Sequence, residues 1–192
     1  MPVSKAEFDK AIGTARNSAE RTQFIGAMLA AETDEEVIVV GGSAVDVYAT
    51  GRQPSLDIDL VTPVRPATPV IERWGFRRRK GRVWRRTDIA TDIDLVGPNY
   101  SGSRRRTRIF VTPFGAVRVA GVEDLVVKRL AELKHWPTTP DWREKLVEQV
   151  AVLLSEPGID EDYLLFVANR DDVVDILADF RRARGTVDVR RE

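Results

Sequence analysis

The stretch Val37–Val61 reads VIVVGGSAVDVYATGRQPSLDIDLV, and the rest of the chain can be interpreted around it. It opens with Val37–Val40, an unbroken β-branched run that is typical of a strand buried on both faces. Gly41 and Gly42 then permit a tight turn, and Ser43 is a favourable N-cap for a short helix. The order predicted is therefore a strand, a glycine turn, a short helix, a loop and a second strand.

The glycine turn predicts a site for phosphate. A helix that begins directly after such a turn points unpaired N–H groups and the positive end of its dipole at one place. Glycine has no Cβ atom, so a ligand can approach the backbone closely. We therefore expect Gly41, Gly42 and Ser43 to bind the phosphates of a nucleotide.

The second predicted strand, over 56–61, carries two aspartates. Because side chains alternate along a strand, Asp57 and Asp59 share one face and the apolar residues beside them share the other. Two carboxylates about 7 Å apart on one face repel each other and are usually held by a cation. Oxygen ligands without His or Cys favour Mg²⁺ or Mn²⁺ over zinc. Together, the phosphate turn and the carboxylate pair indicate metal-assisted attack on a nucleotide phosphate.

The same letters resemble the signature of the nucleotidyltransferase superfamily related to DNA polymerase beta. The matching residues are Gly41-Gly42-Ser43-Ala44-Val45, followed by Arg52-x-x-Ser55-x-Asp57-Ile58-Asp59-Leu60. Within the superfamily, this wording is most similar to that of AbiEii/MenT-type toxins and their uncharacterised relatives. The resemblance implies an α/β (α+β) fold with a mixed sheet flanked by helices, and it adds Arg52 and Ser55 to the nucleotide-binding residues.

A second aspartate strand is predicted over 89–96, which reads IATDIDLV. Asp92 and Asp94 share one of its faces. In the superfamily, a third carboxylate on a strand beside the first pair completes the metal site and activates the attacking hydroxyl. The resemblance assigns this role to Asp94, with Asp92 as the alternative. Asp57, Asp59 and Asp94 would then hold two Mg²⁺ or Mn²⁺ ions.

Positive charge is concentrated between Arg77 and Arg108, although the whole chain has a net charge of 0. This window contains eleven basic residues and only three acidic ones, which leaves it with a charge of +8. Its arginines are either a solvated strand surface or contacts to the phosphates of RNA. The candidate nucleic-acid contacts are Arg77, Arg79, Arg82, Arg85, Arg104, Arg105 and Arg106.

The remaining pattern predicts two domains: a catalytic core with N-terminal helices over 1–121, and a helical region over 122–192 packed on it. In the core we expect helices over 4–17 and 21–31, a proline-containing loop over 62–69, a helical turn over 70–74, and strands over 76–79, 82–87, 108–112 and 116–119. Beyond residue 122 we expect helices over 123–131, 141–154, 159–168 and 171–183, and a charged tail from Gly185.

Two residues of the helical region enter the site through the resemblance alone. The toxin pattern E-D-L-x-x-x-K-L … R-D-x-x-D implies that Lys128 meets the triphosphate or the leaving pyrophosphate, and that Asp141 orients Lys128. The match departs from the pattern at Glu144, which stands where a second aspartate is expected. Without the motif, Lys128 would be an ordinary solvated lysine on a helix.

Composition excludes several other classes. The chain has no cysteine and one histidine, His135, so disulfides, thiolate zinc sites and histidine-rich metal sites are excluded. No apolar run approaches the roughly 20 residues of a membrane span, and we expect a cytoplasmic protein.

The predicted function is a metal-dependent nucleotidyltransferase (EC 2.7.7-type) that transfers NMP from an NTP to a hydroxyl. The resemblance favours the tRNA 3′ end as acceptor and the role of toxin in a toxin–antitoxin pair. A hydroxyl on a cognate antitoxin or on a small molecule stays open. The alternatives are an inactive module of the same fold that binds nucleotide, RNA or a protein partner, and a phosphate-ester hydrolase.

Overall fold

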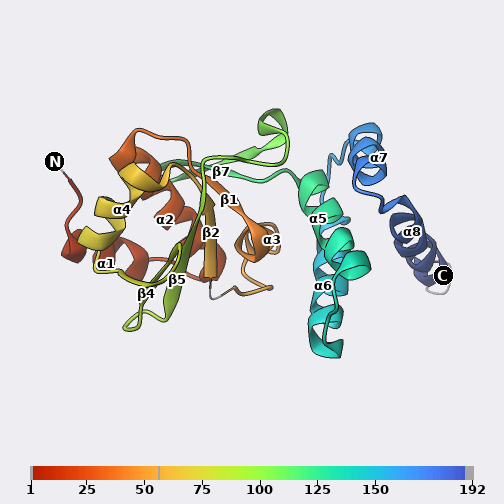
Figure 1. The fold of residues 1–192 in the computed structure, drawn as a ribbon, viewed down its shortest axis with the longest axis horizontal. Coiled ribbons are helices and arrows are strands. Elements are labelled where there is room, and N and C mark those ends of the chain that lie inside the picture. The colour runs from red at the N-terminus through yellow and green to blue at the C-terminus, as the bar shows by residue number, and fades with distance from the viewer. Residues whose placement is uncertain (1, 56, 189–192) are drawn as a thin grey trace. The chain divides into compact units, whose positions relative to one another are not determined.

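The computed structural model describes residues 2–55 and 57–188, with side chains as far as residue 182. The chain divides into two compact units, Met1–Gly121 and Val122–Glu192, and each is described by itself (Figure 1). The first unit contains the sheet and the glycine turn, and the second is helical.

The described residues of the first unit form a seven-stranded mixed sheet with the order β3-β4-β5-β2-β1-β7-β6. Two neighbouring pairs, β2 with β5 and β1 with β7, are parallel, and the other pairs are antiparallel. The strands are β1 (Ile38–Val40), β2 (Asp57–Val61), β3 (Arg77–Lys80), β4 (Val83–Arg86), β5 (Thr91–Gly97), β6 (Arg108–Thr112) and β7 (Gly115–Val119). The predicted mixed sheet is confirmed.

Helices cover the apolar face of this sheet. They are α1 (Lys5–Gly13), α2 (Ser18–Thr33), α3 (Gly41–Tyr48) and α4 (Val64–Arg73), and a short 3₁₀ turn, η1 (Arg104–Arg106), precedes β6. Helix α2 contacts the other three helices as well as β1, β6 and β7. At Gly26 it lies directly on the sheet, since a Cβ atom there would come 2.6 Å from Val117 Cγ2. The buried face therefore includes Val39, Leu60 and Leu95, and the aspartates point the other way.

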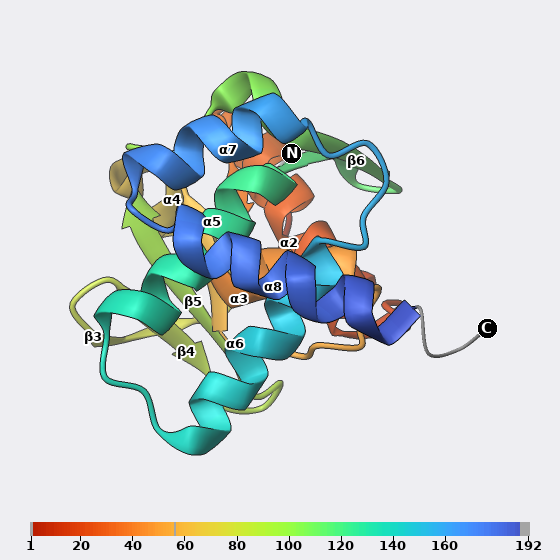
Figure 2. The same ribbon diagram turned by 90° about the vertical axis from the view of Figure 1, so that its right-hand side faces the viewer.

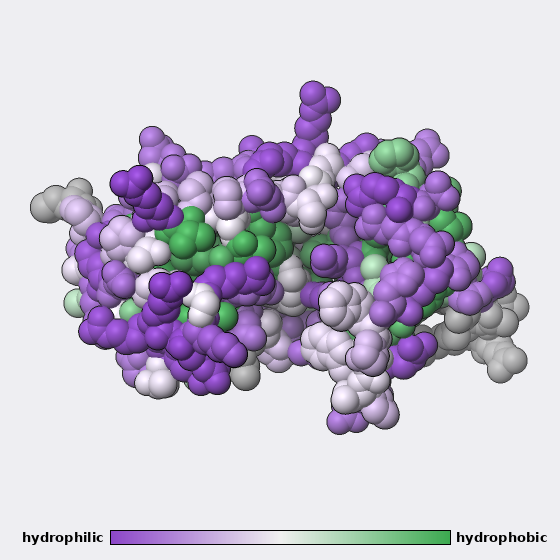
Figure 3. Space-filling view, viewed as in Figure 1, coloured by the Kyte–Doolittle hydropathy of each residue, from purple (hydrophilic) through white to green (hydrophobic). Residues whose placement is uncertain are grey.

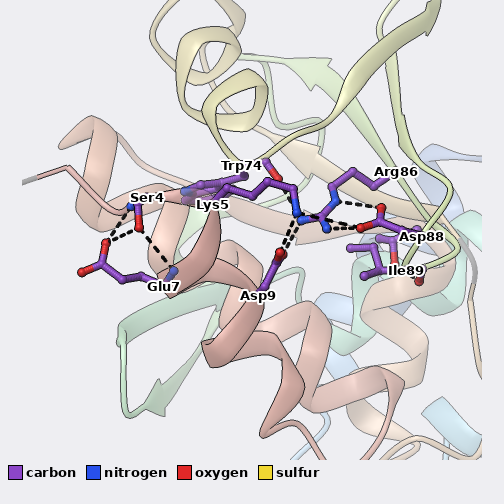
Figure 4. Close-up of polar contacts among 9 residues, drawn as sticks. Ser4, Lys5, Glu7, Asp9, Trp74, Arg86, Asp88 and Ile89 are labelled. Carbon is purple, nitrogen blue, oxygen red and sulfur yellow. Dashed lines mark hydrogen bonds and ion pairs between the residues drawn. The ribbon is translucent and has the colours of Figure 1, made fainter.

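Arg86 anchors α1 to the strands on this helix-covered face (Figure 4). Its side chain is buried, forms ion pairs with Asp9 and Asp88, and donates a hydrogen bond to the carbonyl oxygen of Trp74. The ring of Phe8 stacks on Trp74 with centroids 4.5 Å apart. Hydrogen bonds from Arg86 lower the pKa of both aspartates below the ordinary value. A charged group is tolerated in this core because carboxylates compensate it.

The two N-terminal helices have different limits from those predicted. Helix α1 ends at Gly13 and not near residue 17, and α2 begins at Ser18, three residues earlier than expected. The reason is Asn17, whose side chain accepts a hydrogen bond from Glu20 N and caps α2. The cap predicted at Ser4 is present, as a capping box with Glu7.

The predicted loop over 62–69 is wrong, because residues 64–73 form helix α4. Pro66 lies in the first turn, where a missing N–H removes no intrahelical hydrogen bond. Only Pro69 lies in the interior of the helix. The cost of that proline is offset by burial of Ala67, Val70 and Ile71 against the rest of the unit.

The second unit is all-helical in its described part, as predicted, and Figure 2 shows its helices. They are α5 (Val122–His135), α6 (Pro140–Leu153), α7 (Glu161–Arg170) and α8 (Val174–Asp188). Helix α5 is central, since it contacts each of the others. Its buried Glu123 accepts a hydrogen bond from Asp160 N, and Asp124 accepts one from the Tyr163 hydroxyl. Helix α8 continues to Asp188, so the tail expected from Gly185 is wrong as far as the described residues go.

No helix in the described part of the chain combines the length and the apolar character needed to cross a membrane.

Candidate active site

Strands β2 and β5 bring four carboxylates to one face of the sheet. The strands are parallel and in register, so that Asp57 pairs with Asp92 and Asp59 pairs with Asp94. Paired residues on adjacent strands point to the same face, and their strands are about 4.8 Å apart. The two segments that share the letters DIDLV therefore form one acidic surface opposite the helix layer.

The glycine turn lies against this surface. Gly41 has φ +62°, and a Cβ atom there would come 2.0 Å from Asp59 Oδ2. Only glycine fits, because a side chain would both strain the backbone and displace the carboxylate. Helix α3 begins at Gly41, and no side chain caps its first N–H groups. The turn thus presents backbone donors beside Asp59, which suits an anionic ligand.

Ser43 does not cap the helix, contrary to the prediction, because α3 starts two residues before it. Its side chain is completely buried. The hydroxyl donates a hydrogen bond to Val40 O (3.0 Å) and accepts one from Asp59 N (3.2 Å). Ser43 therefore fixes the turn to the aspartate strand, and its proposed contact with phosphate stays a prediction.

The two aspartate pairs have different surroundings. Asp57 is exposed and Asp59 is half-buried. Asp92 is buried, with Arg85 Nε 2.6 Å from Oδ1 and Arg79 Nη1 3.3 Å from Oδ2. The arginines come from the neighbouring β3–β4 hairpin, in which Arg85 is paired with Asp92 across the strands. The β5 carboxylates thus form ion pairs with arginines of the same chain.

Asp94 has one such partner, Arg82. The Arg82 Nε atom lies 2.7 Å from Asp94 Oδ1 and 3.0 Å from Oδ2, and the longer of these contacts is the hydrogen bond. Within the described residues Oδ1 is buried and accepts no hydrogen bond, although it belongs to the ion pair. A buried carboxylate oxygen held by charge alone can accept another ligand.

These residues fit a hard divalent cation. Asp57, Asp59 and Asp94 offer only oxygen donors, which Mg²⁺ and Mn²⁺ prefer. In residues 2–55 and 57–188 no three acidic, His or Cys side chains already lie close enough together to share an ion. Like charges repel, and ion pairs with arginines of the hairpin keep the carboxylates of Asp92 and Asp94 away from those of β2. The carboxylates would therefore turn toward one another when an ion binds.

Arg52 and Ser55 lie in the loop between α3 and β2. Arg52 Nε donates to Ala49 O (3.0 Å), and the Ser55 hydroxyl donates to Asp57 O (2.9 Å). Both residues thus shape the entry into β2, and nucleotide contacts by either one stay predictions.

Lys128 and Asp141 belong to the helical unit, and both are exposed. In the part of the chain that the structure describes, no hydrogen bond or ion pair joins them. Lys128 lies near Asp171 instead: a hydrogen bond from Arg170 is the main cause that lowers the pKa of Asp171, and the charge of Lys128 contributes. The roles assigned to Lys128 and Asp141 remain predictions.

The basic residues predicted as nucleic-acid contacts fall into two groups. Arg79, Arg82 and Arg85 are counterions of β5, a role that the sequence interpretation missed. The signal was available, because the hairpin directly precedes β5 and would pair with it. Arg77 and Arg105 are exposed, Arg106 is half-buried, and Arg104 binds Glu36 at 2.7 Å.

A hollow of 310 Å³ lies beside the hairpin, and its lining includes Arg77, Arg78, Arg79, Arg85 and Arg86. In Figure 3 the surface around the hairpin is strongly hydrophilic. The hairpin therefore keeps a positive surface even though four of its arginines, Arg79, Arg82, Arg85 and Arg86, have acidic partners.

No protein-family model matches this chain, and no curated protein does. Several solved structures are similar in fold, and three are described. The antibiotic-resistance factor ANT(2'')-Ia, solved in solution, has a TM-score of 0.56 and 15% identity, with 91% of this chain and 98% of that chain covered. ANT(2'')-Ia in complex with adenylyl-2''-tobramycin has a TM-score of 0.56 and 15% identity, over 78% of this chain and 93% of that chain.

The third structure is an antigenic nucleotidyltransferase-like protein from Paracoccidioides brasiliensis, with a TM-score of 0.57 and 12% identity over 98% of this chain and 94% of that chain. At these identities, the likeness defines the fold. The chain has the fold of nucleotidyltransferases, which confirms the predicted fold class. The resemblance to AbiEii/MenT-type toxins stays a prediction.

Proposed function

We propose that this chain is a nucleotidyltransferase that transfers NMP from an NTP to the hydroxyl group of an acceptor. One observation carries the proposal: in a nucleotidyltransferase fold, β2 and β5 align four aspartates on one face beside a glycine turn that only glycine can form. A chain that used this fold only as a scaffold would have no need for adjacent like charges.

The chemistry assigns a task to each group. The first N–H groups of α3 bind the triphosphate, and Asp57, Asp59 and Asp94 would hold the divalent ions, Mg²⁺ or Mn²⁺. When bound, two such ions neutralise charge on the attacking and leaving oxygens. The acceptor oxygen bonds to the α-phosphorus as the bond to pyrophosphate breaks. Asp94, with Asp92 as the alternative, receives the proton of the acceptor hydroxyl.

Lys128 and Asp141 complete the proposal. Lys128 would meet the triphosphate or the leaving pyrophosphate, because a compact cation suits that charge. Asp141 would orient it. These two assignments rest on the toxin resemblance.

The acceptor has two candidates, each with its own support. The exposed Arg77 and Arg105 and the +8 window favour RNA, with the tRNA 3′ end and a toxin–antitoxin role implied by the resemblance. The ANT(2'')-Ia complex with adenylyl-2''-tobramycin favours a small-molecule hydroxyl. The first candidate predicts steep loss of activity with salt, and the second predicts little loss.

The alternative is an inactive binding module of the same fold. The arginines on Asp92 and Asp94 favour it, because guanidinium groups already neutralise these carboxylates. The two proposals differ in what happens when NTP, acceptor and a divalent ion are combined: pyrophosphate should be released in the first and not in the second.

The test is incubation with each α-labelled NTP and Mg²⁺, with total tRNA or an aminoglycoside as acceptor. We expect label on one acceptor and release of one pyrophosphate per transfer. Asp57→Asn should abolish both, whereas Asp34→Asn, an exposed aspartate in the same unit, should leave them intact. Transfer at the wild-type rate by Asp57→Asn would refute the assignment. Phosphate release to water without pyrophosphate would indicate a hydrolase instead.

A further inference from the structure

The two β5 carboxylates form different numbers of ion pairs with the β3–β4 hairpin. Asp92 is buried and contacted by two guanidinium groups, from Arg85 and Arg79. Asp94 is half-buried and is contacted by one guanidinium group, from Arg82. A buried carboxylate with two guanidinium partners costs more to release than a half-buried carboxylate with one partner.

The backbone around Arg82 supports such a release. Arg82 occupies the hairpin turn with Gly81, and its carbonyl oxygen accepts a hydrogen bond from Leu95 N (3.1 Å). The strand pairing of β4 and β5 therefore holds the backbone in place, while the Arg82 side chain is 57% exposed. The side chain can leave Asp94 without any movement of the sheet.

We propose that Arg82 is a positioning residue that occupies the cation position at Asp94 until a divalent ion displaces it. Arg82 keeps the Asp94 carboxylate oriented when no ion is bound. After displacement, the Arg82 guanidinium would pair with the triphosphate. The ion that binds Asp94 also binds the phosphates, so the phosphates would lie near the displaced guanidinium. Asp92 keeps its arginines throughout. This inference rests on the proposed function and assigns the exchangeable carboxylate to Asp94.

We expect removal of the Arg82 guanidinium to change two affinities in opposite directions, that for Mn²⁺ and that for the nucleotide. Without Arg82 the ion has no competitor, so Arg82→Gln should bind Mn²⁺ alone about fivefold more tightly than the wild type. In the presence of Mn²⁺, the same variant should bind a non-hydrolysable NTP analogue more weakly, because a guanidinium partner of the phosphates is lost. A general loss of positive charge would shift both affinities in the same directions, so the comparison with a charge-matched variant of the same hairpin separates it from loss of the Asp94 contact.

Mn²⁺ binding is measured by electron paramagnetic resonance on the whole chain, and nucleotide binding by calorimetry. Arg77→Gln is the charge-matched control on the same hairpin and should change Mn²⁺ affinity less than Arg82→Gln does. The double variant Arg82→Gln with Asp94→Asn should lose the gain. Thermal melting by circular dichroism verifies that each variant is folded.

The outcomes separate the two proposals. Tighter Mn²⁺ binding without any label transfer by the wild type would support the role of Arg82 and refute the enzyme. Label transfer with Mn²⁺ affinity unchanged or weakened in Arg82→Gln would support the enzyme and overturn the role of Arg82. Absence of Mn²⁺ binding in both the wild type and the variant, with or without nucleotide, would overturn both.

Discussion

Strands β2 and β5 spell the same five letters, DIDLV, yet their aspartates have different surroundings. Their apolar residues behave alike: Ile58 and Ile93 are both buried, as are Leu60 and Leu95. The surroundings of their carboxylates differ because each strand has a different second neighbour. Besides pairing with each other, β2 pairs with the apolar β1, whereas β5 pairs with β4, which carries arginines. Alternation along a strand thus determines which face a residue takes, and the neighbouring strand determines its electrostatic environment.

The largest effect should come from the β2 carboxylates. Asp59 lies directly against the glycine turn that is proposed to bind the triphosphate. Asp59→Asn should lower label transfer about a thousandfold or more, equivalent to about 4 kcal/mol of barrier, with little change in thermal stability. The measurement is the initial rate with an α-labelled NTP. A rate within tenfold of the wild type would refute a catalytic role for Asp59.

The apolar half of the comparison predicts equal effects on the two strands. Ile58→Ala and Ile93→Ala each remove a buried side chain from the face under the helices. Each should lower the free energy of unfolding by about 3 kcal/mol in urea titrations followed by fluorescence. The two strands would not be equivalent, and the comparison would fail, if one of these substitutions were nearly neutral.

The two arginines of β4 lie on opposite faces of the sheet, and the side chain of Arg86 lies on the face covered by helices. Arg86→Gln removes the buried partner of Asp9 and Asp88. We expect a loss of about 2 kcal/mol in unfolding free energy, less than for a fully buried pair because both aspartates are partly exposed. Arg77→Gln, on the exposed edge strand, is the matched control and should change stability little. Equal stability of Arg86→Gln and the wild type would contradict the anchoring role.

The smallest effect is one of pH. The pKa values of Asp9 and Asp88 are lowered in the folded state below the ordinary 3.8. Their contribution to stability is therefore complete above that value and is lost as the pH falls through the lower, folded-state pKa. Unfolding midpoints measured below about pH 4 should decrease more steeply for the wild type than for Arg86→Gln. Parallel pH profiles for the two proteins would contradict this assignment.

Much of the fold follows from local pattern. The β-branched run before Gly41, the two alternating aspartate segments and the hairpin around Gly81 were all predictable, because strands and tight turns leave short-range signals. Helix α4 was not, since Pro66 and Pro69 argue against a helix and only burial of Ile71 and its neighbours outweighs them. Tertiary packing, which a single sequence does not display, decides such cases.

The candidate site was predictable in the same measure. That β5 would lie beside β2 followed from the resemblance, and the alternation placed each carboxylate on its face. The ion pairs of Arg79, Arg82 and Arg85 were missed, because a cluster of arginines was interpreted as an external surface before its pairing with β5 was considered. The register between the hairpin and β5, and not the composition of the hairpin, determines which of its arginines pair with the aspartates.

The central claim is that carboxylates of β2 and β5 converge on divalent ions beside the glycine turn. The most direct measurement is a crystal structure with Mn²⁺ and a non-hydrolysable NTP analogue, with the ions located by anomalous scattering. We expect anomalous peaks within bonding distance of Asp57 and Asp59, with Asp94 released from Arg82 and bound to one of these ions. Nucleotide bound with no peak at these carboxylates, or with Asp94 still paired to Arg82, would contradict the claim.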